Sequence, residues 1–203
     1  MTSVLVAIDG AVLMSIGLAD SIRASSREAV SALKQRGITP VMLTGDREAA
    51  AREIAAQAGI DDVIAEVQPT QKAAEVEKRQ RRGEVVAMVG DGINDAPALA
   101  QADIGIAIGS GTDIAKSTAD ITLVRNDLMS LIEALKVSDA TLKNIKQNLF
   151  FAFIYNALGV PVAAGVLYPF LGMTLSPMLA AAAMSLSSVS VISNALRLRT
   201  AKL

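Results

Sequence analysis

The chain has 203 residues, a formal net charge of −1, and neither cysteine nor histidine. The near-neutral charge gives no reason to expect a nucleic-acid partner. The lack of cysteine excludes disulfides and thiol catalysis, and the lack of histidine excludes a Ser-His-Asp triad and histidine-ligated metals.

Up to about residue 125, short apolar runs alternate with helical patterns. Strands are predicted over residues 4–8, 12–19, 38–43, 63–67, 85–89, 103–108 and 121–124. Helices are predicted from Ser25 or Ser26 to Gln35, from Asp46 as N-cap to Gly59, from Pro69 to Arg82, and after Asn94, Asp113 and Asp127. Strands that alternate with helices in this way indicate βαβ units and a parallel sheet.

The apolar residues that raise the mean hydropathy to +0.43 lie toward the C-terminus. From Gln147 to Leu196 there is no Asp, Glu, Lys or Arg. A membrane-spanning helix needs roughly 20 apolar residues, so we expect spans near 149–167 and 175–196, joined at Tyr168–Gly172. Cationic residues on both sides predict that both termini are cytosolic: Lys143, Lys146, Arg197, Arg199 and Lys202. The alternative is a buried two-helix hairpin in a soluble core.

Polar residues follow several predicted strands. Thr44–Asp46 follows one strand, Asp91 and Asp95 follow another, and Lys72 lies near the start of the helix predicted from Pro69. The carboxyl ends of parallel strands share one edge of a sheet, where ligands bind. The two carboxylates suit Mg²⁺, and the lysine, hydroxyl and amides suit phosphate oxygens, which together suit phosphoryl transfer. Taken singly, each feature is equally consistent with a turn, a helix cap or a surface lysine.

Three of these segments, in this order, resemble the phosphorylation domain of P-type ATPases, which has the haloacid-dehalogenase-like fold: Met42-Leu-Thr-Gly-Asp46, Pro69-Thr-Gln-Lys72 and Val89-Gly-Asp-Gly-Ile-Asn-Asp-Ala-Pro97. Further similar segments are Ala7–Gly10 with Leu18–Asp20, Ala102–Gly109 and Gly111–Lys116. The resemblance implies an α/β parallel-sheet domain over 21–135. It also implies a remnant of the nucleotide-binding domain over 1–20 and a membrane region with a two-helix transmembrane hairpin over 136–203.

The resemblance also assigns roles to individual residues. Thr44 and Gly45 would contact the phosphoryl group, Asp46 would stabilise the loop or contact the nucleotide, and Lys72 would stabilise an aspartyl-phosphate. Mg²⁺ would be held by Asp91, Asn94 and Asp95. Mg²⁺ and ATP are therefore the implied cofactors.

The C-terminal segment resembles that of copper-transporting members at Tyr155-Asn156 and at Met184 with Ser188. Met184 and Ser188 are four residues apart and share a helix face, and a thioether suits Cu(I). The absence of charge in the predicted spans argues against zinc and potassium transporters. The implied function is ATP hydrolysis coupled to Cu(I) export by a multi-pass protein of the bacterial inner membrane. A packing methionine and a helix–helix hydrogen bond are the simpler interpretations.

Two motifs of such pumps are not in this sequence: the Asp-Lys-Thr-Gly-Thr phosphoryl acceptor and the Cys-Pro-Cys ion site. We therefore expect the C-terminal third of a pump, with an incomplete ATP site and no activity by itself. Its expected partners are membrane lipid, Cu(I) and the missing pump domains in trans. One alternative is a non-catalytic membrane-anchored partner or half of a split pump. Another is a Mg²⁺-dependent phosphatase that uses Asp9, although Ala11 occupies the position of the second aspartate of such enzymes.

Overall fold

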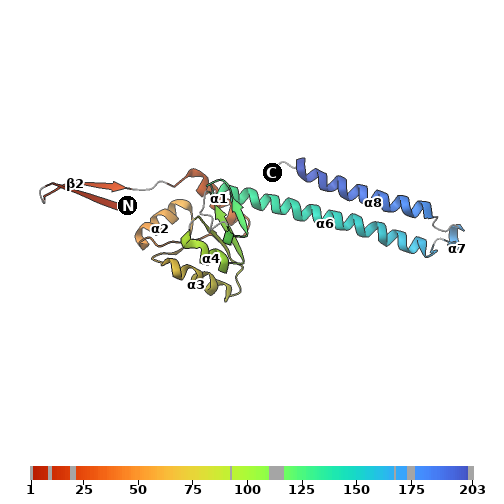
Figure 1. Ribbon diagram of the computed structural model, residues 1–203, viewed down its shortest axis with the longest axis horizontal. Helices are drawn as coiled ribbons and strands as arrows, with labels where there is room; N and C mark the ends of the chain where they lie inside the picture. The colour runs from red at the N-terminus through yellow and green to blue at the C-terminus, as the bar shows by residue number, and fades with distance from the viewer. Residues whose placement is uncertain are drawn as a thin grey trace. The chain divides into compact units, whose positions relative to one another are not determined.

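A computed structural model describes residues 2–8, 11–18, 22–91, 93–109, 117–166, 168–172 and 177–200 (Figure 1). The chain forms two compact units, Met1–Ile132 and Glu133–Leu203. Asp9, Asp20 and the matching segment 111–116 lie outside the described residues, so the expectations attached to them stay predictions.

The first unit alternates strands with helices, as predicted. Its strands are β1 (Thr2–Ile8), β2 (Ala11–Leu18), β3 (Val41–Leu43), β4 (Asp62–Ile64), β5 (Ala87–Gly90), β6 (Ile104–Ile108) and β7 (Ile121–Leu123). Its helices are α1 (Ala24–Gln35), α2 (Glu48–Ala58), α3 (Pro69–Gln80), the 3₁₀ turn η1 (Ile93–Asp95) and α4 (Ala96–Gln101). The parallel α/β class is confirmed.

The strands form three separate sheets. β1 and β2 form an antiparallel hairpin, β3 pairs in parallel with β4, and β5, β6 and β7 form a parallel sheet in that order. One continuous parallel sheet was the expectation. Among the described strands, β3 and β5 instead each have a partner on one side only.

Small residues let the helices pack closely on these strands. α2 buries Ala51, Ala55 and Ala58. Leu99 of α4 is 1 % exposed and belongs to a core cluster with Val76, Met88 and Ala98, against which Leu43 packs. At Gly105 an added Cβ would lie 2.5 Å from the backbone oxygen of Leu99, so glycine is needed for β6 to approach α4. This core fixes α3, α4 and β5, which carry the candidate site.

Some predicted boundaries are wrong, and the reasons are local. β3 begins at Val41 because Pro40 has no N–H to donate to a strand. Val85 is 84 % exposed and precedes β5. The N-cap of α2 is Arg47, since the carboxylate of Asp46 is engaged elsewhere.

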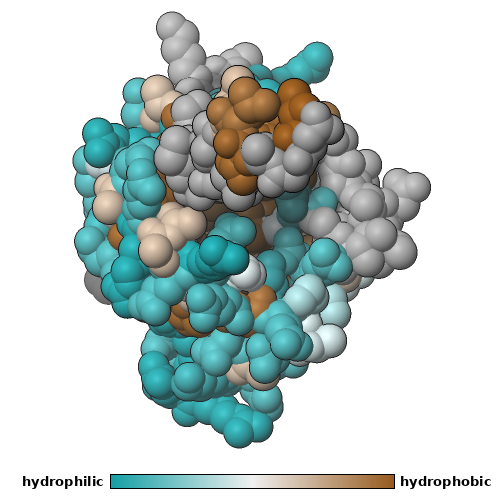
Figure 2. All heavy atoms as spheres, turned by 90° about the vertical axis from the view of Figure 1, so that its left-hand side faces the viewer, coloured by the Kyte–Doolittle hydropathy of each residue, from teal (hydrophilic) through white to brown (hydrophobic). Residues whose placement is uncertain are grey.

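The β1–β2 hairpin presents apolar side chains to solvent. Ile8, Val12, Leu13 and Met14 are all more than half exposed. Figure 2 shows a group of brown hydrophobic atoms on a face whose other coloured atoms are mainly teal.

The second unit is an antiparallel pair of helices. α6 (Met129–Ala163) begins in the first unit and continues into the second, and is followed by α7 (Tyr168–Leu171), α8 (Pro177–Arg197) and the 3₁₀ turn η2 (Leu198–Thr200). α6 and α8 lie side by side (Figure 1), and the Asn144 amide donates to the Asn194 carbonyl at 2.7 Å. No helix formed by the described residues has both the length and the apolar character that a bilayer crossing requires. The expected spans near 149–167 and 175–196 are therefore not confirmed.

Candidate phosphoryl-transfer site

The centre of the candidate site is an ion pair between Lys72 and Asp95. Lys72 Nζ lies 2.7 Å from Asp95 Oδ1, and the two side chains are only 16 % and 12 % exposed. Ion pairs of such low exposure are screened less by salt and water than surface pairs. The structure thus brings together two residues that are 23 positions apart in the sequence and that were both predicted to belong to one site.

Local structure places both partners. Pro69 suits the first turn of α3, where an N–H would have no helical partner, and the Gln68 N–H donates to Gln71 Oε1 at 3.2 Å. Lys72 therefore lies in the first turn of α3, whose start is fixed by these features. Asp95 ends η1, the turn that connects β5 to α4.

Gly90, the last residue of β5, is packed against Asp95. A Cβ added at Gly90 would lie 2.6 Å from Asp95 Cβ and 2.8 Å from Asp95 Oδ2. No side chain fits at that distance. Glycine at this position is therefore what allows the Asp95 carboxylate to reach Lys72.

Thr44, Gly45 and Asp46 form a loop that is braced internally. The Thr44 hydroxyl donates to Asp46 Oδ2 at 2.8 Å, and the Asp46 N–H donates to Thr44 Oγ1 at 3.1 Å. The loop is also joined to the segment before α3, since the Val67 N–H donates to the Thr44 carbonyl at 3.1 Å and the Glu66 N–H to that of Asp46 at 2.9 Å. Because Val67 lies just before α3, these bonds link the loop to the helix that carries Lys72.

Asp91 and Asn94 are exposed members of the site, as are Gly45 and Asp46. Asp91 follows β5 directly, and Asn94 lies in η1. Across the described ranges, no group of three or more Asp, Glu, His or Cys side chains is arranged to hold a metal. Mg²⁺ commonly binds through one or two carboxylates together with phosphate oxygens and water, so this donor set fits Mg²⁺ that arrives with a phosphate.

The residues predicted for copper transport make different contacts. Tyr155 Oη lies 3.4 Å from Ser190 Oγ across the helix pair. The Asn156 amide donates to the Ala152 carbonyl at 3.0 Å, and the Ser188 hydroxyl donates to the Met184 carbonyl at 3.3 Å, each within its own helix. The Met184 side chain is exposed.

Sequence reasoning missed a network of asparagines between α6 and α8. The Asn148 amide donates to Asn144 Oδ1 at 3.0 Å, and the Asn194 amide donates to Asn148 Oδ1 at 2.9 Å. Asn144 and Asn148 are four residues apart and share a helix face. That spacing of two amides on one helix face was the available signal.

A second missed group surrounds Arg79 of α3. Arg79 binds Asp62 of β4, and its Nη1 lies 3.2 Å from Glu84. The hydrogen bond to Asp62 is the main cause that raises the pKa of the guanidinium above its ordinary value, and desolvation opposes it. These bonds hold α3 against β4.

Comparison with known proteins gives consistent matches. Two sequence profiles of haloacid dehalogenase-like hydrolases match residues 2–103 and 72–135. The chain is 59 % identical over 198 residues to "Probable copper-transporting ATPase PacS" of Synechococcus elongatus, which covers 98 % of the chain and 26 % of that protein. It is 55 % identical over 202 residues to "Silver exporting P-type ATPase" of Salmonella typhimurium, which covers 100 % of the chain and 24 % of that protein.

A solved structure matches as well. The crystal structure of a zinc-transporting PIB-type ATPase in the E2.Pi state superposes with a TM-score of 0.81 at 41 % identity, over 97 % of this chain and 31 % of that one. The chain spans about a quarter of the length of the curated relatives it matches.

Proposed function

The chain belongs to the haloacid dehalogenase-like hydrolase family, and on that premise we propose that it is a portion of a P-type ATPase that couples ATP hydrolysis to Cu(I) export. In this proposal residues 21–135 form the phosphorylation domain and residues 136–203 the membrane region. Residues 1–20 are the end of a nucleotide-binding domain.

The observation that carries the proposal is the Lys72–Asp95 ion pair. Phosphoryl transfer depends on positioned positive charge near the transferred group. Asp95 holds the Lys72 ammonium at 2.7 Å in a fixed place, so this cation needs little reorganisation when a phosphate arrives. Lys72 would then stabilise the charge of an aspartyl-phosphate, and Asp95 would position Lys72.

The remaining residues complete the same site. Thr44 and Gly45 would contact the phosphoryl oxygens through the braced loop, and Asp46 would keep that loop in shape. Asp91 and Asn94, with Asp95, would hold Mg²⁺, which neutralises phosphate charge when it is bound.

We infer that the phosphoryl acceptor comes from outside this sequence, and the divided sheet supports this inference. β3 and β5 each have one edge without a partner among the described strands. A cavity of about 350 Å³ is lined by Met42 of β3, Ile108 of β6 and Val30 of α1. We infer that an additional strand, which bears the acceptor aspartate, joins these sheets from another part of the longer pump or from a partner chain.

Placement in a membrane and choice of cargo rest on the second unit. Residues 147–196 carry no charge, and the relatives named above are described as copper- and silver-transporting. The Met184 thioether is a soft ligand that suits Cu(I) better than divalent zinc. We therefore propose Cu(I) as cargo, with Tyr155, Asn156 and Ser188 along its path.

A chimera tests this proposal. This chain replaces the aligned region of the Synechococcus relative, and the product is incubated with γ-labelled ATP and Mg²⁺. We expect an acid-stable labelled band and Cu(I)-stimulated ATP hydrolysis. Lys72→Ala and Asp91→Asn should each abolish most of the label, whereas Lys78→Ala, which changes an exposed lysine of the same helix, should not.

The unfused chain is the second arm. We expect no acid-stable label from it, and label that disappears in Asp9→Asn would instead identify Asp9 as an acceptor. For the cargo, Met184→Leu in the chimera should remove Cu(I) stimulation, whereas Met178→Leu, at another exposed methionine of α8, should retain it. Equal behaviour of these two variants would contradict the assignment of Met184.

A further inference from the structure

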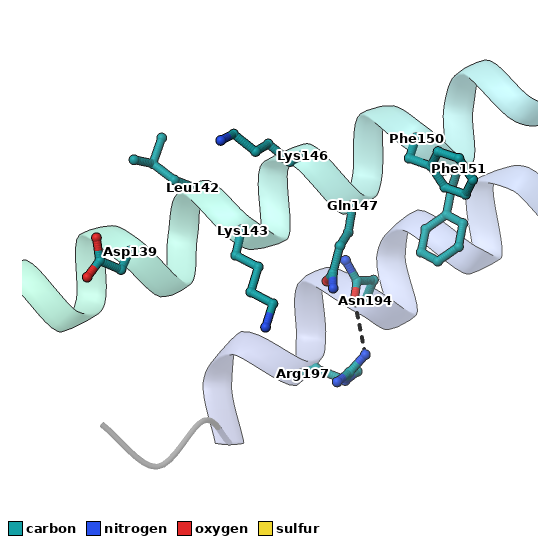
Figure 3. Close-up of a pocket in the computed structure, with 9 residues that line it drawn as sticks. All are labelled: Asp139, Leu142, Lys143, Lys146, Gln147, Phe150, Phe151, Asn194 and Arg197. Atoms are coloured by element: carbon teal, nitrogen blue, oxygen red, sulfur yellow. Dashed lines mark hydrogen bonds between the residues drawn. The ribbon is translucent and has the colours of Figure 1, made fainter.

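A pocket of about 640 Å³ lies between α6 and α8 (Figure 3). Its lining combines positive charge with aromatic rings: Lys143, Lys146 and Arg197 are cationic, Phe150 and Phe151 are aromatic, and Asp139 supplies one negative charge. Positive side chains therefore outnumber negative ones, and the electrostatics favour an anion.

The two kinds of side chain lie at opposite ends of the pocket. Lys143 and Lys146 precede the uncharged segment that begins at Gln147, and Arg197 follows its end at Leu196. Phe150 is inside that segment and 61 % exposed. A ligand that fills the pocket would meet charge at one end and apolar rings at the other, so it should be amphipathic.

The walls of the pocket are held in place by the asparagine network. Asn194 is 5 % exposed and joins α8 to Asn144 and Asn148 of α6. Arg197 Nη1 donates to Asn194 Oδ1 at 3.4 Å, which ties the arginine to the same network. In Figure 3 the Lys143 side chain extends toward α8, whereas Lys146 points away from it. Lys143 and Arg197 are thus the principal charges of the pocket.

We propose that this pocket binds an anionic phospholipid, with its phosphate between Lys143 and Arg197 and an acyl chain against Phe150 and Phe151. Basic pockets between helices at the cytosolic face of a membrane suit such headgroups. The proposal rests on the membrane placement proposed above. It adds a lipid-binding site to the second unit that is separate from the candidate phosphoryl-transfer residues.

The test uses the full chain in neutral detergent, titrated with phosphatidylglycerol and with phosphatidylcholine, and bound lipid is counted by native mass spectrometry. We expect preferential retention of phosphatidylglycerol. The double substitution Lys143→Gln/Arg197→Gln should weaken that retention about 25-fold, since each cation near a membrane surface contributes about a 5-fold gain. Lys143→Arg should retain it. Far-ultraviolet circular dichroism checks that helix content is unchanged.

The matched control is Lys136→Gln/Arg199→Gln, which removes two positive charges from the same unit outside the pocket. An equal loss in this control would show general charge attraction and overturn the proposal. Inorganic phosphate is the competitor, and displacement of phosphatidylglycerol by millimolar phosphate would show a free-anion site and overturn the lipid assignment.

Failure of this site and failure of the membrane placement give different results. Association with pure phosphatidylcholine vesicles that survives carbonate washing tests the membrane placement alone. A chain that stays in those vesicles but retains both lipids equally in detergent would contradict only the pocket.

Discussion

The two units of this chain are organised in opposite ways. In the α/β unit the buried residues are mostly apolar, such as Val76 and Leu99, and the buried Asp95 is paired with Lys72. In the helical unit, Asn194 is the one buried residue among those described, while Phe153 and Leu158 are 68 % and 65 % exposed.

This contrast identifies what stabilises each unit. The α/β unit can gain stability in water by removing apolar surface from solvent. The helical pair leaves much of its apolar surface exposed and makes polar contacts between its helices. It therefore gains little stability in water from the burial of apolar surface. Apolar surface this extensive normally marks contact with lipid or with other protein, and the function proposed above gives the second unit such an environment.

The largest difference between the two units is expected when one leucine is truncated in each. Leu99→Ala should lower the free energy of unfolding by about 3 kcal/mol, because it leaves a cavity in a packed core. Leu158→Ala should change it by less than about 0.5 kcal/mol, because its side chain is already exposed. Urea unfolding of the full chain in mild detergent measures both. Similar losses would mean that the two units are not packed differently.

The next largest effect on stability is expected from the Lys72–Asp95 ion pair. Asp95→Asn should destabilise the α/β unit by about 2 kcal/mol, because it leaves the Lys72 ammonium largely buried without a counter-charge. Glu75→Gln, at the partly exposed i,i+3 pair with Lys78, should cost about 0.5 kcal/mol or less. Urea midpoints at two salt concentrations measure both losses of stability. Equal losses for Asp95→Asn and Glu75→Gln would contradict a larger contribution from the Lys72–Asp95 pair.

A smaller effect is expected from the polar interior of the helical unit. Asn194→Leu should destabilise the helix pair by about 1 kcal/mol, since it removes the hydrogen bonds that the Asn194 amide donates to Asn148 Oδ1 and to the Asn144 carbonyl. Asn156→Leu should be nearly neutral, because Asn156 bonds only within its own helix in the contacts described. Thermal melting followed by circular dichroism in detergent micelles distinguishes the two. A stabilised Asn194→Leu variant would show that apolar packing holds this pair.

The smallest effect concerns pH. The hydrogen bond from the Val86 N–H, at 2.8 Å, is the main cause that holds the pKa of Asp103 below its usual value of 3.8. A carboxylate with a lowered folded pKa stabilises the fold above that usual value and loses the contribution as pH falls through its folded pKa. Asp103→Asn should therefore flatten the pH dependence of the urea midpoint below about pH 4. If the pH dependence of the urea midpoint were the same in Asp103→Asn, the proposed stabilising contribution of Asp103 would be contradicted.

The order of elements was predictable from the sequence because it depends on local signals. Gly59, in the left-handed conformation, ends α2 as predicted, and Asp127 precedes α6, where its carboxylate accepts from the Met129 N–H at 2.9 Å. Lys72 and Asp95 were both assigned to one site because parallel strands place their ends together.

Other features depend on contacts that no local pattern contains. β3 and β5 belong to different sheets among the described strands, and strand pairing between distant segments is not encoded by a local pattern. Val85 looked like a strand residue because β-branched side chains favour strands, yet it lies in solvent. The role of Asn194 depends on which face of α6 meets α8, and periodicity in one helix does not determine its partner.

The open edges of β3 and β5 also affect the tendency of this chain to aggregate in a cell. An unpaired strand edge offers its backbone to any other strand, and folded proteins usually protect such edges. In the function proposed above, the additional strand would cover the edges of β3 and β5 as well as supply the catalytic aspartate. Without it, a second copy of the same domain could pair with the same edges.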